Sequence, residues 1–296
     1  MNTKTAMITI AGRPNVGKST LTNYLVGEKI AIVSNKPQTT RNRICGIVTR
    51  EDTQFVFVDT PGYHKARTKL GDYMVNISRE SIANVDATIL VVEPIASIGP
   101  QEEGLIAQIK GSKCPAILAI NKIDTVEKES LLEVIALYSQ TGAFDAIIPI
   151  SAKTGDGVED LLKTCDKYAI ESPFLFDPDL TTDQPERQVM AEIIREKILW
   201  NLDREVPHGT AVEITRFSER DSGIIDIDAT IYCEKQSHKG IIIGKRGDML
   251  KKISSMARTD CERFMGTKVF LTTWVKVKEN WRESDFLVRN FGYNDN

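Results

Sequence analysis

Residues 12–19 read Gly-Arg-Pro-Asn-Val-Gly-Lys-Ser and match the phosphate-loop pattern Gly-x4-Gly-Lys-Ser/Thr. A β-branched run, Met7–Ala11, precedes the loop, and a helical stretch, Ser19–Leu25, follows it. Glycines let main-chain N–H groups close around phosphate oxygens, and the start of a helix adds a favourable partial charge. Although a chance match is the alternative, this context predicts an α/β domain with a phosphate site. The candidate contacts are Gly12, Arg13, Pro14, Asn15, Val16, Gly17, Lys18, Ser19 and Thr20.

From residue 6 to about 172, apolar runs alternate with helical stretches. Several runs are apolar throughout, as expected for strands that a parallel sheet buries on both faces. After the first strand we expect strands at Phe55–Asp59, Ala87–Val92, Ala116–Asn121 and Ala146–Ile150, and helices at Leu70–Ala83, Glu102–Gly111, Glu129–Gln140 and Gly157–Ile170. The alternation predicts a doubly wound, mainly parallel sheet, whose ligands lie at the carboxyl ends of the strands.

The second strand ends in Asp59-Thr60-Pro61-Gly62. An acidic side chain at this end of a sheet, beside a phosphate loop, is well placed to hold Mg²⁺ through water. Gly62 can offer its N–H to a γ-phosphate, and Thr60 and Pro61 complete this set of candidate contacts. The alternative is a simple turn, because Pro-Gly after a strand usually forms one.

Asn121-Lys122-Ile123-Asp124 ends a later strand and indicates which base is bound. Guanine presents adjacent N1–H and N2–H₂ donors that one carboxylate accepts together, whereas adenine presents an acceptor at N1. A carboxylate at Asp124 would therefore select guanine, because it would stay unpaired against adenine. Ser151-Ala152-Lys153, after the next strand, is placed to contact the edge of the base. A helix N-cap is the alternative role for Asp124.

Composition limits the class of protein. The chain has 296 residues, 41 % apolar and 27 % charged, which excludes intrinsic disorder and suggests about two domains. Its apolar runs are too short to cross a bilayer, and no signal-peptide pattern is visible, so we expect a cytoplasmic protein. The five scattered cysteines are expected to be reduced thiols, with no disulfide frame or zinc cluster.

The charge is unevenly distributed. The net charge is −3, yet residues 235–278 hold eleven Lys or Arg and three Asp or Glu. Such a basic segment in an acidic protein is a candidate polyanion-binding surface, although a solvated helix face is the alternative. Earlier in the chain, residues 173–188 include three prolines and four acidic residues, and this stretch is predicted to be a linker. We therefore expect domains at 1–172 and 189–296.

The second domain contains a Gly-Lys-Arg-Gly loop at residues 244–247. Around it we expect a helix at Val189–Glu205, strands at Ala211–Phe217 and Ile224–Tyr232, a helix at Met249–Phe264 and a strand at Lys268–Val277. Glycines let a sugar–phosphate backbone approach, and cations neutralise its phosphates. A mere helix–turn–helix corner is the alternative. The candidate RNA contacts are Lys239, Ile241, Ile242, Ile243, Gly244, Lys245, Arg246 and Gly247, and the tryptophans Trp200, Trp274 and Trp281 are expected in the core.

These motifs carry a family resemblance. The four nucleotide motifs resemble the small-G-protein superfamily, and Asn15 with the stretch Gln38-Thr39-Thr40-Arg41 resembles its translation-associated branch, which includes the Era, Der and MnmE GTPases. The second domain resembles a type II KH domain. One G domain followed by one KH domain resembles the Era family, because Der has two G domains and MnmE places its G domain inside a longer chain.

The resemblance implies roles for individual residues. Thr40 is expected to join Ser19 and Asp59 at Mg²⁺ when GTP is bound, with Thr39 the less suitable residue. Lys18, Thr40 and Gly62 would act on the γ-phosphate, and Asn15 matches the asparagine that holds K⁺ in some relatives. Where Ras-type proteins have a water-orienting glutamine, this chain has Tyr63, so we expect slow hydrolysis that a monovalent ion or a partner accelerates.

The resemblance also implies a biological role. It predicts a bacterial, cytoplasmic, monomeric GTPase that uses GTP, GDP and Mg²⁺, binds the 3′ end of 16S rRNA and assists maturation of the small ribosomal subunit. It also implies peripheral contact with the inner face of the membrane, which no feature of this sequence predicts independently. Two rivals remain open: an RNA-binding module with GTP as a structural cofactor, and an ATP-dependent phosphotransferase, which Asp124 disfavours.

Overall fold

The computed structural model describes residues 3–62, 68–81 and 85–293. The contacts of the chain divide it into two compact units. Among the described residues, the first unit takes 3–31, 40–62 and 74–183, and the second takes 32–39, 68–73 and 184–293. The boundary at residue 183 falls inside the segment 173–188 that was predicted to be a linker, and two short segments from the N-terminal half of the chain group with the C-terminal unit.

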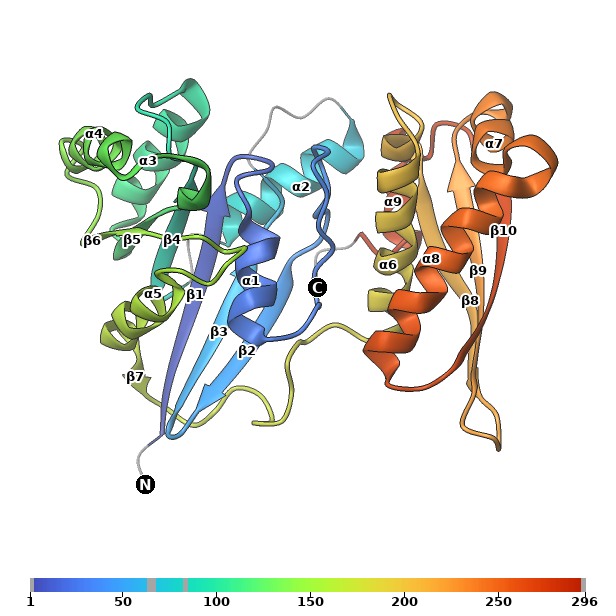
Figure 1. Ribbon diagram of the computed structural model, residues 1–296, viewed down its shortest axis with the longest axis horizontal. Helices are drawn as coiled ribbons and strands as arrows, with labels where there is room; N and C mark the ends of the chain where they lie inside the picture. The colour runs from blue at the N-terminus through green and yellow to red at the C-terminus, as the bar shows by residue number, and fades with distance from the viewer. Residues whose placement is uncertain (1–2, 63–67, 82–84, 294–296) are drawn as a thin grey trace. The chain divides into compact units, whose positions relative to one another are not determined.

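A largely parallel sheet forms the centre of the first unit (Figure 1). Its strands run in the order β2 (Ile44–Arg50), β3 (Thr53–Asp59), β1 (Lys4–Gly12), β4 (Ala87–Val92), β5 (Ala116–Ile120) and β6 (Ala146–Pro149). The doubly wound α/β prediction is confirmed. The sequence analysis missed β2, which pairs antiparallel with β3 through a tight turn and so has no helix before its partner. It also missed the two-residue strand β7 (Ile170–Glu171), which pairs antiparallel with β1.

Helices cover both faces of this sheet. One apolar cluster joins α1 (Lys18–Val26) and α5 (Val158–Cys165) to side chains such as Ile8 and Ile10 of β1. A second cluster joins α3 (Pro100–Ser112) and α4 (Lys128–Ser139) to the opposite face. The remaining helix, α2, spans Lys69–Glu80. This arrangement explains the continuous apolar runs in the sequence, because a strand that is covered on both faces needs apolar side chains on both faces.

Residues 181–183, within the segment predicted to be a linker, lie beside the edge strand β2. Ile47 N–H donates to the Thr181 carbonyl at 2.9 Å, and Cys45 N–H donates to Asp183 Oδ1 at 3.0 Å. An edge strand carries main-chain groups without a neighbouring strand, and this stretch satisfies several of them. Residues 173–183 therefore belong to the first unit, and the second unit resumes at Gln184.

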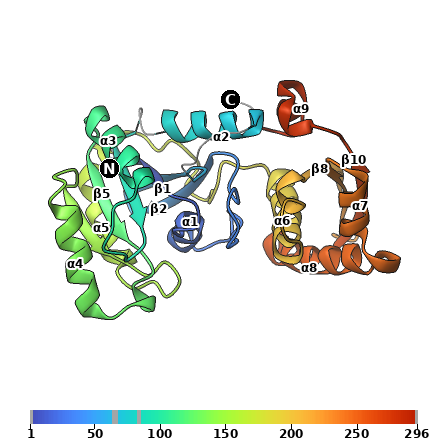
Figure 2. The same ribbon diagram turned by 90° about the horizontal axis from the view of Figure 1, so that it is seen from above.

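The second unit packs helices on one face of a three-stranded sheet (Figure 2). Its elements are α6 (Glu186–Asn201), β8 (Ala211–Glu219), β9 (Ile225–Cys233), α7 (Gln236–Ile243), α8 (Asp248–Met265), β10 (Val269–Val277) and α9 (Asp285–Asn290). The sheet order is β10-β9-β8, with β10 parallel to β9 and β8 antiparallel to it. This α-β-β-α-α-β order confirms the predicted type II KH topology.

The tryptophans of this unit separate into two groups. Trp281 is fully buried and donates from Nε1 to the Gly209 carbonyl, so its prediction as core is confirmed. The same prediction is wrong for Trp200 and Trp274, which are 48 % and 59 % exposed. Trp274 lies on the open face of the sheet, and Trp200 lies on α6. In the part of the chain that is described, no helix is long and apolar enough to span a bilayer.

Candidate guanine-nucleotide site and RNA-binding loop

The phosphate loop joins the end of β1 to the start of α1, as predicted. Gly17 caps the helix with φ 101°, a left-handed conformation that side chains disfavour. A Cβ at this position would lie 2.2 Å from Asn121 Nδ2, so only glycine fits. This close approach brings the loop against the motif at the end of β5. Thr20 lies in the first turn of α1, directly after Ser19.

Lys18 is held inside the loop. Its Nζ donates to the carbonyls of Gly12 at 3.1 Å and Arg13 at 2.9 Å, and the side chain is buried. Burial lowers the pKa of Lys18 to about 8, while the nearby Asp59 opposes this shift. A buried ammonium whose partners are neutral carbonyls is poised to bind a stronger acceptor, such as a phosphate oxygen.

Three side chains from different elements meet beside Lys18. Ser19 Oγ donates to Asp59 Oδ2 at 2.7 Å and lies 2.8 Å from Thr40 Oγ1. Asp59 is fully buried, and this burial raises its pKa to about 6, against the opposing effects of Lys18 and Ser19. The structure therefore brings together the three residues that the sequence analysis assigned to Mg²⁺, and it places the Thr40 hydroxyl there rather than that of Thr39, which donates to the Lys36 carbonyl.

This cluster fits a hydrated magnesium ion. The second carboxylate oxygen of Asp59, Oδ1, is buried with no hydrogen-bond partner among the described residues. A buried anionic oxygen of this kind is costly unless water or a cation satisfies it. Within the same residues no group of three or more acidic, His or Cys side chains forms a metal cage. Mg²⁺ suits such a site, since it keeps several waters and takes further oxygens from phosphate.

Gly62 lies close to the phosphate loop. A Cβ on Gly62 would come within 2.7 Å of Pro14 N, so a side chain here would displace the loop. Thr60 is fully buried and donates to the Ile10 carbonyl at 3.1 Å, which ties the residues around Pro61 to β1. The segment therefore does more than turn the chain, because it is packed against the expected position of the phosphates. Tyr63, which replaces the water-orienting glutamine, lies outside the described residues.

The residues predicted to recognise the base form a second cluster. Asn121 donates to the Val16 carbonyl at 2.8 Å and accepts from Ala152 N–H at 2.9 Å, so it ties the phosphate loop to the segment after β6. Ser151 Oγ donates to Asp124 Oδ1 at 2.7 Å. Asp124 lies inside a short 3₁₀ turn, Ile123–Thr125, whose N-cap is Lys122, so the N-cap role considered for Asp124 is not observed. Its carboxylate is exposed, and so is Lys153.

The sequence analysis missed two carboxylates that hold this site together. Glu93 pairs with Lys122 at 2.6 Å and with Arg13 at 3.4 Å. Glu102, almost fully buried on α3, forms an ion pair with the Nε of Arg13. Lys122 also donates to the Asn15 carbonyl at 2.7 Å. Glu93 directly follows β4, so the rule applied to Asp59, an acidic residue at the carboxyl end of a strand, would have found it.

The Gly-Lys-Arg-Gly loop joins α7 to α8. Gly244 has φ 76° and a Cβ there would meet Met249 Cβ at 2.6 Å, while Gly247 caps α8 with φ 85°. Lys245 and Arg246 are exposed on the loop between them, and Lys239 on α7 is half-buried. The exposed side chains Lys251, Lys252 and Arg258 of α8 extend the positive charge beyond the loop.

One predicted RNA contact needs correction. The run Ile241–Ile243 is the end of α7, and its three side chains point in different directions. Ile242 is fully buried in the apolar core of the unit, so its side chain cannot contact RNA here. Ile241 is exposed, and Ile243 is half-buried. A helix turns by about 100° per residue, so three consecutive residues cannot share one face.

Both units match known protein families. Residues 7–122 match the family described as 50S ribosome-binding GTPase, and residues 205–282 match the KH domain family. The chain is 53 % identical over 296 residues to GTPase Era of Ruminiclostridium cellulolyticum, covering all of this chain and 99 % of the relative. It is 50 % identical over 294 residues to GTPase Era of Clostridioides difficile, covering 99 % of each.

Two solved structures resemble the whole chain. One is Era in complex with MgGDPNP and nucleotides 1506–1542 of 16S ribosomal RNA, with a TM-score of 0.94, 36 % identity, and 99 % of this chain and 100 % of that one covered. The other is a tyrosine-to-alanine variant of Aquifex aeolicus Era bound to GDP and AlF₄⁻, with a TM-score of 0.94, 37 % identity and the same coverage.

Proposed function

This chain belongs to the Era family of GTPases, and we propose that it binds the 3′ end of 16S rRNA through its KH domain and assists maturation of the small ribosomal subunit. The observation that carries the proposal is the presence, in one chain, of a guanine-nucleotide site and an exposed basic KH loop. The solved relative that contains both a GTP analogue and 16S nucleotides supports the same pairing.

The family description that matches the G domain names the 50S subunit, whereas 16S rRNA belongs to the 30S subunit. A sedimentation experiment separates the two. With a GTP analogue bound, the purified protein should co-sediment with isolated 30S subunits, and added 50S subunits should not compete. Preferential binding to 50S subunits would contradict the proposal and leave the nucleotide chemistry intact.

The residues around the γ-phosphate suggest how GTP is hydrolysed. Lys18 exchanges its two carbonyl partners for phosphate oxygens, and the N–H groups of the loop bind the rest of the phosphate charge. Ser19, Thr40 and, through water, Asp59 would hold Mg²⁺, which offsets negative charge when bound. Thr40 and Gly62 hold their chain segments at the γ-phosphate. Hydrolysis removes that phosphate and therefore releases both segments.

Monovalent ions provide a test of the role proposed for Asn15. Asn15 sits in the phosphate loop with φ 66°, and a K⁺ ion beside it would add positive charge next to the phosphates. We expect hydrolysis of GTP to be about tenfold faster in KCl than in NaCl at equal ionic strength. The variant Asn15→Ala should remove that difference. Equal rates for the unmodified protein in the two salts would remove K⁺ from the mechanism.

RNA binding should depend on the charges of the KH loop. Removing two cations with Lys245→Ala and Arg246→Ala should weaken binding to a single-stranded 16S 3′-end oligonucleotide and flatten its salt dependence by about 1.4 in log–log slope. Titrations at several salt concentrations measure both quantities. Lys268→Ala removes an exposed charge beyond the other end of α8 and should leave both almost unchanged. An unaltered slope in the double variant would assign RNA binding to another surface.

Nucleotide and RNA binding are proposed to be coupled. We expect the RNA oligonucleotide to bind about tenfold more tightly with a GTP analogue than with GDP. Because coupling is reciprocal, the RNA should raise the affinity for the analogue by the same factor. Fluorescence titrations in both directions measure the two factors. Equal RNA affinities in the two nucleotide states would favour the rival function, an RNA-binding module with GTP as a structural cofactor.

Two finer expectations rest on the family resemblance alone. A monomeric state can be tested by analytical ultracentrifugation at several protein concentrations. Peripheral contact with the inner face of the membrane can be tested by flotation with vesicles of bacterial lipids.

A further inference from the structure

Eight residues from the first half of the chain, Ile32–Thr39, pack as part of the C-terminal unit. Their neighbours on both sides, Ala31 and Thr40, belong to the first unit. The segment therefore leaves the nucleotide-binding unit and returns to it immediately before the threonine proposed to reach Mg²⁺. Its contacts with the KH domain are made by α6 and the residues that follow it.

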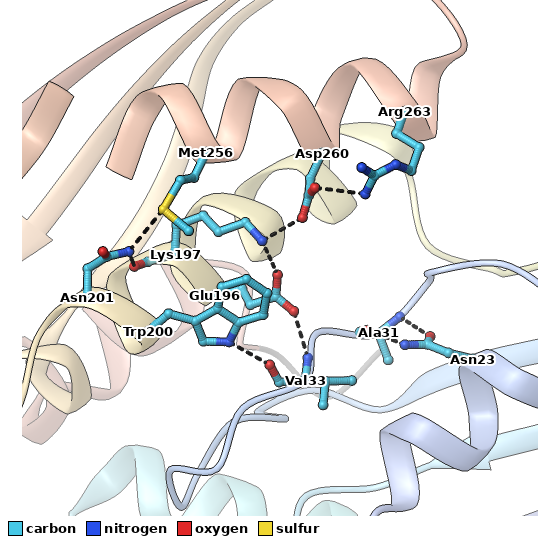
Figure 3. Close-up of polar contacts among 10 residues, drawn as sticks. All are labelled: Asn23, Ala31, Val33, Glu196, Lys197, Trp200, Asn201, Met256, Asp260 and Arg263. Carbon is cyan, nitrogen blue, oxygen red and sulfur yellow. Dashed lines mark hydrogen bonds and ion pairs between the residues drawn. The ribbon is translucent and has the colours of Figure 1, made fainter. Parts of the chain in front are cut away.

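Val33 is held at both of its main-chain groups (Figure 3). Its N–H donates to Glu196 Oε1 at 2.9 Å, and its carbonyl accepts from Trp200 Nε1 at 2.9 Å. Glu196 and Trp200 are four residues apart and lie on the same face of α6. One turn of α6 thus satisfies both main-chain groups of Val33, as a neighbouring β-strand would do, although Val33 is not part of a sheet.

The end of the segment nearest Thr40 is held as well. Lys36 Nζ donates to the Leu202 carbonyl and to Asp203 Oδ1, the latter at 3.0 Å. Arg195 Nη2 donates to the Thr39 carbonyl. Arg195 is 1 % exposed, and its Nε also donates to Glu192 Oε1 at 2.8 Å. Lys36 pairs with Asp203 and Arg195 pairs with Glu192, while Arg195 Nη1 is buried without a hydrogen-bond partner among the described residues.

We propose that Arg195 is a positioning residue for the nucleotide site and that it acts through the peptide bond between Thr39 and Thr40. That bond is planar, so the carbonyl of Thr39 and the N–H of Thr40 share one plane. When Arg195 holds the carbonyl, the orientation of this plane is set. Only the rotations of Thr40 itself remain to place its hydroxyl, which lies 2.8 Å from Ser19 Oγ.

The same helix is also tied to α8 of the KH domain (Figure 3). Lys197 Nζ lies 2.7 Å from Glu196 Oε2 and 2.5 Å from Asp260 Oδ2 on α8, the helix that begins directly after the Gly-Lys-Arg-Gly loop. Arg263 completes the group by donating to Asp260 at 3.0 Å. Because Glu196 and Lys197 are buried, losing one partner leaves an uncompensated charge.

The hydrogen bond from Val33 to Glu196 and the position of α8 are therefore energetically linked, because Lys197 bridges Glu196 and Asp260. RNA bound at the start of α8 and Thr40 bound at the nucleotide site would then favour the same arrangement of α6. This last step rests on the proposed coupling of RNA and nucleotide binding. The positioning role of Arg195 does not, since it requires only the nucleotide.

The test compares full-length Glu192→Gln with Glu192→Gln/Arg195→Met, so that no unpaired carboxylate is left behind. In the presence of Mg²⁺ the second change should lower the affinity for a non-hydrolysable GTP analogue about tenfold and leave GDP affinity within about twofold. Only the analogue engages Thr40. Arg187→Met, an exposed arginine on the same helix, is the matched control. Equal losses for analogue and GDP, or no loss for either, would overturn the proposal.

A second variant keeps the proposal testable if the double variant fails to fold. Trp200→Phe removes one hydrogen bond to Val33 from a half-exposed side chain, and Trp274→Phe changes a similarly exposed tryptophan with no such bond. Amide hydrogen exchange over residues 32–39, with the analogue bound, should become about fivefold faster in Trp200→Phe alone. Equal exchange in the two variants would contradict the anchoring role of α6. If the unmodified protein bound no 16S oligonucleotide, the proposed RNA function would fail while both of these results could still be obtained.

Discussion

Lys18→Ala should lower the affinity for GTP about 1,000-fold or more and abolish measurable hydrolysis. The ammonium group is buried beside Asp59, with two carbonyls that it can exchange for phosphate oxygens. The loss is expected to be large because hydrogen bonds to ionised groups in buried sites are the strong ones. Isothermal titration with GTP and Mg²⁺ measures the affinity, and phosphate release measures the rate.

The variant should fold as well as the unmodified protein. Burial lowers the pKa of Lys18 from 10.5 to about 8, so the folded state disfavours its charged form. Stability therefore rises with pH between about 8 and 10.5 in the unmodified protein, because the unfolded chain holds the extra proton there. At pH 7 alanine removes an unfavourable buried charge but also removes the cation that favours ionised Asp59, so thermal unfolding without nucleotide should change little.

Lys110→Ala, at an exposed position on α3, is the matched control and should bind GTP normally. If Lys18→Ala retained GTP affinity within tenfold, the phosphate loop could not be the site described here. The variant also separates the two functions proposed for the chain. Normal support of subunit assembly by Lys18→Ala would favour the reading in which the nucleotide is only structural.

Asp124→Asn should lower the affinity for GTP about 1,000-fold and change which base is bound. The carboxylate accepts from Ser151 Oγ through Oδ1, and it is exposed at the edge where a base would lie. Two donors of guanine would lose an ionised acceptor and face an amide NH₂ instead. Xanthine replaces the guanine amino group with a carbonyl, which such an amide can bind.

Competition against a fluorescent GTP analogue checks this prediction. For Asp124→Asn, xanthosine triphosphate should compete better than GTP, and for the unmodified protein the order should be reversed. Asp156→Asn changes an exposed carboxylate in the neighbouring loop and should preserve the preference for GTP. If ATP competed with GTP in the unmodified protein, Asp124 would not be the specificity residue and the phosphotransferase reading would regain support.

The first unit was predictable because its signals are local. Each strand that the sequence analysis identified carries its own apolar run, and each motif follows a strand, so parallel pairing brings the motifs to one edge of the sheet. The strand β2 was missed because an antiparallel partner needs no helix between the two strands. Ile242 was misassigned because its neighbours in the sequence look alike, and only packing shows which of the three faces the core.

The residues proposed to bind the phosphates and the base could be located from the order of the chain alone, since their chemistry depends on short motifs whose spacing is preserved in the fold. The contacts that hold Thr40 in place could not be identified in this way. Val33 and Glu196 lie 163 residues apart, and nothing in either stretch signals a partner at that distance. Contacts of this kind arise when a segment packs against elements far from it in the sequence. Hydrogen bonds between main-chain groups and buried charges depend on where those elements pack, and they leave no periodic pattern in the sequence.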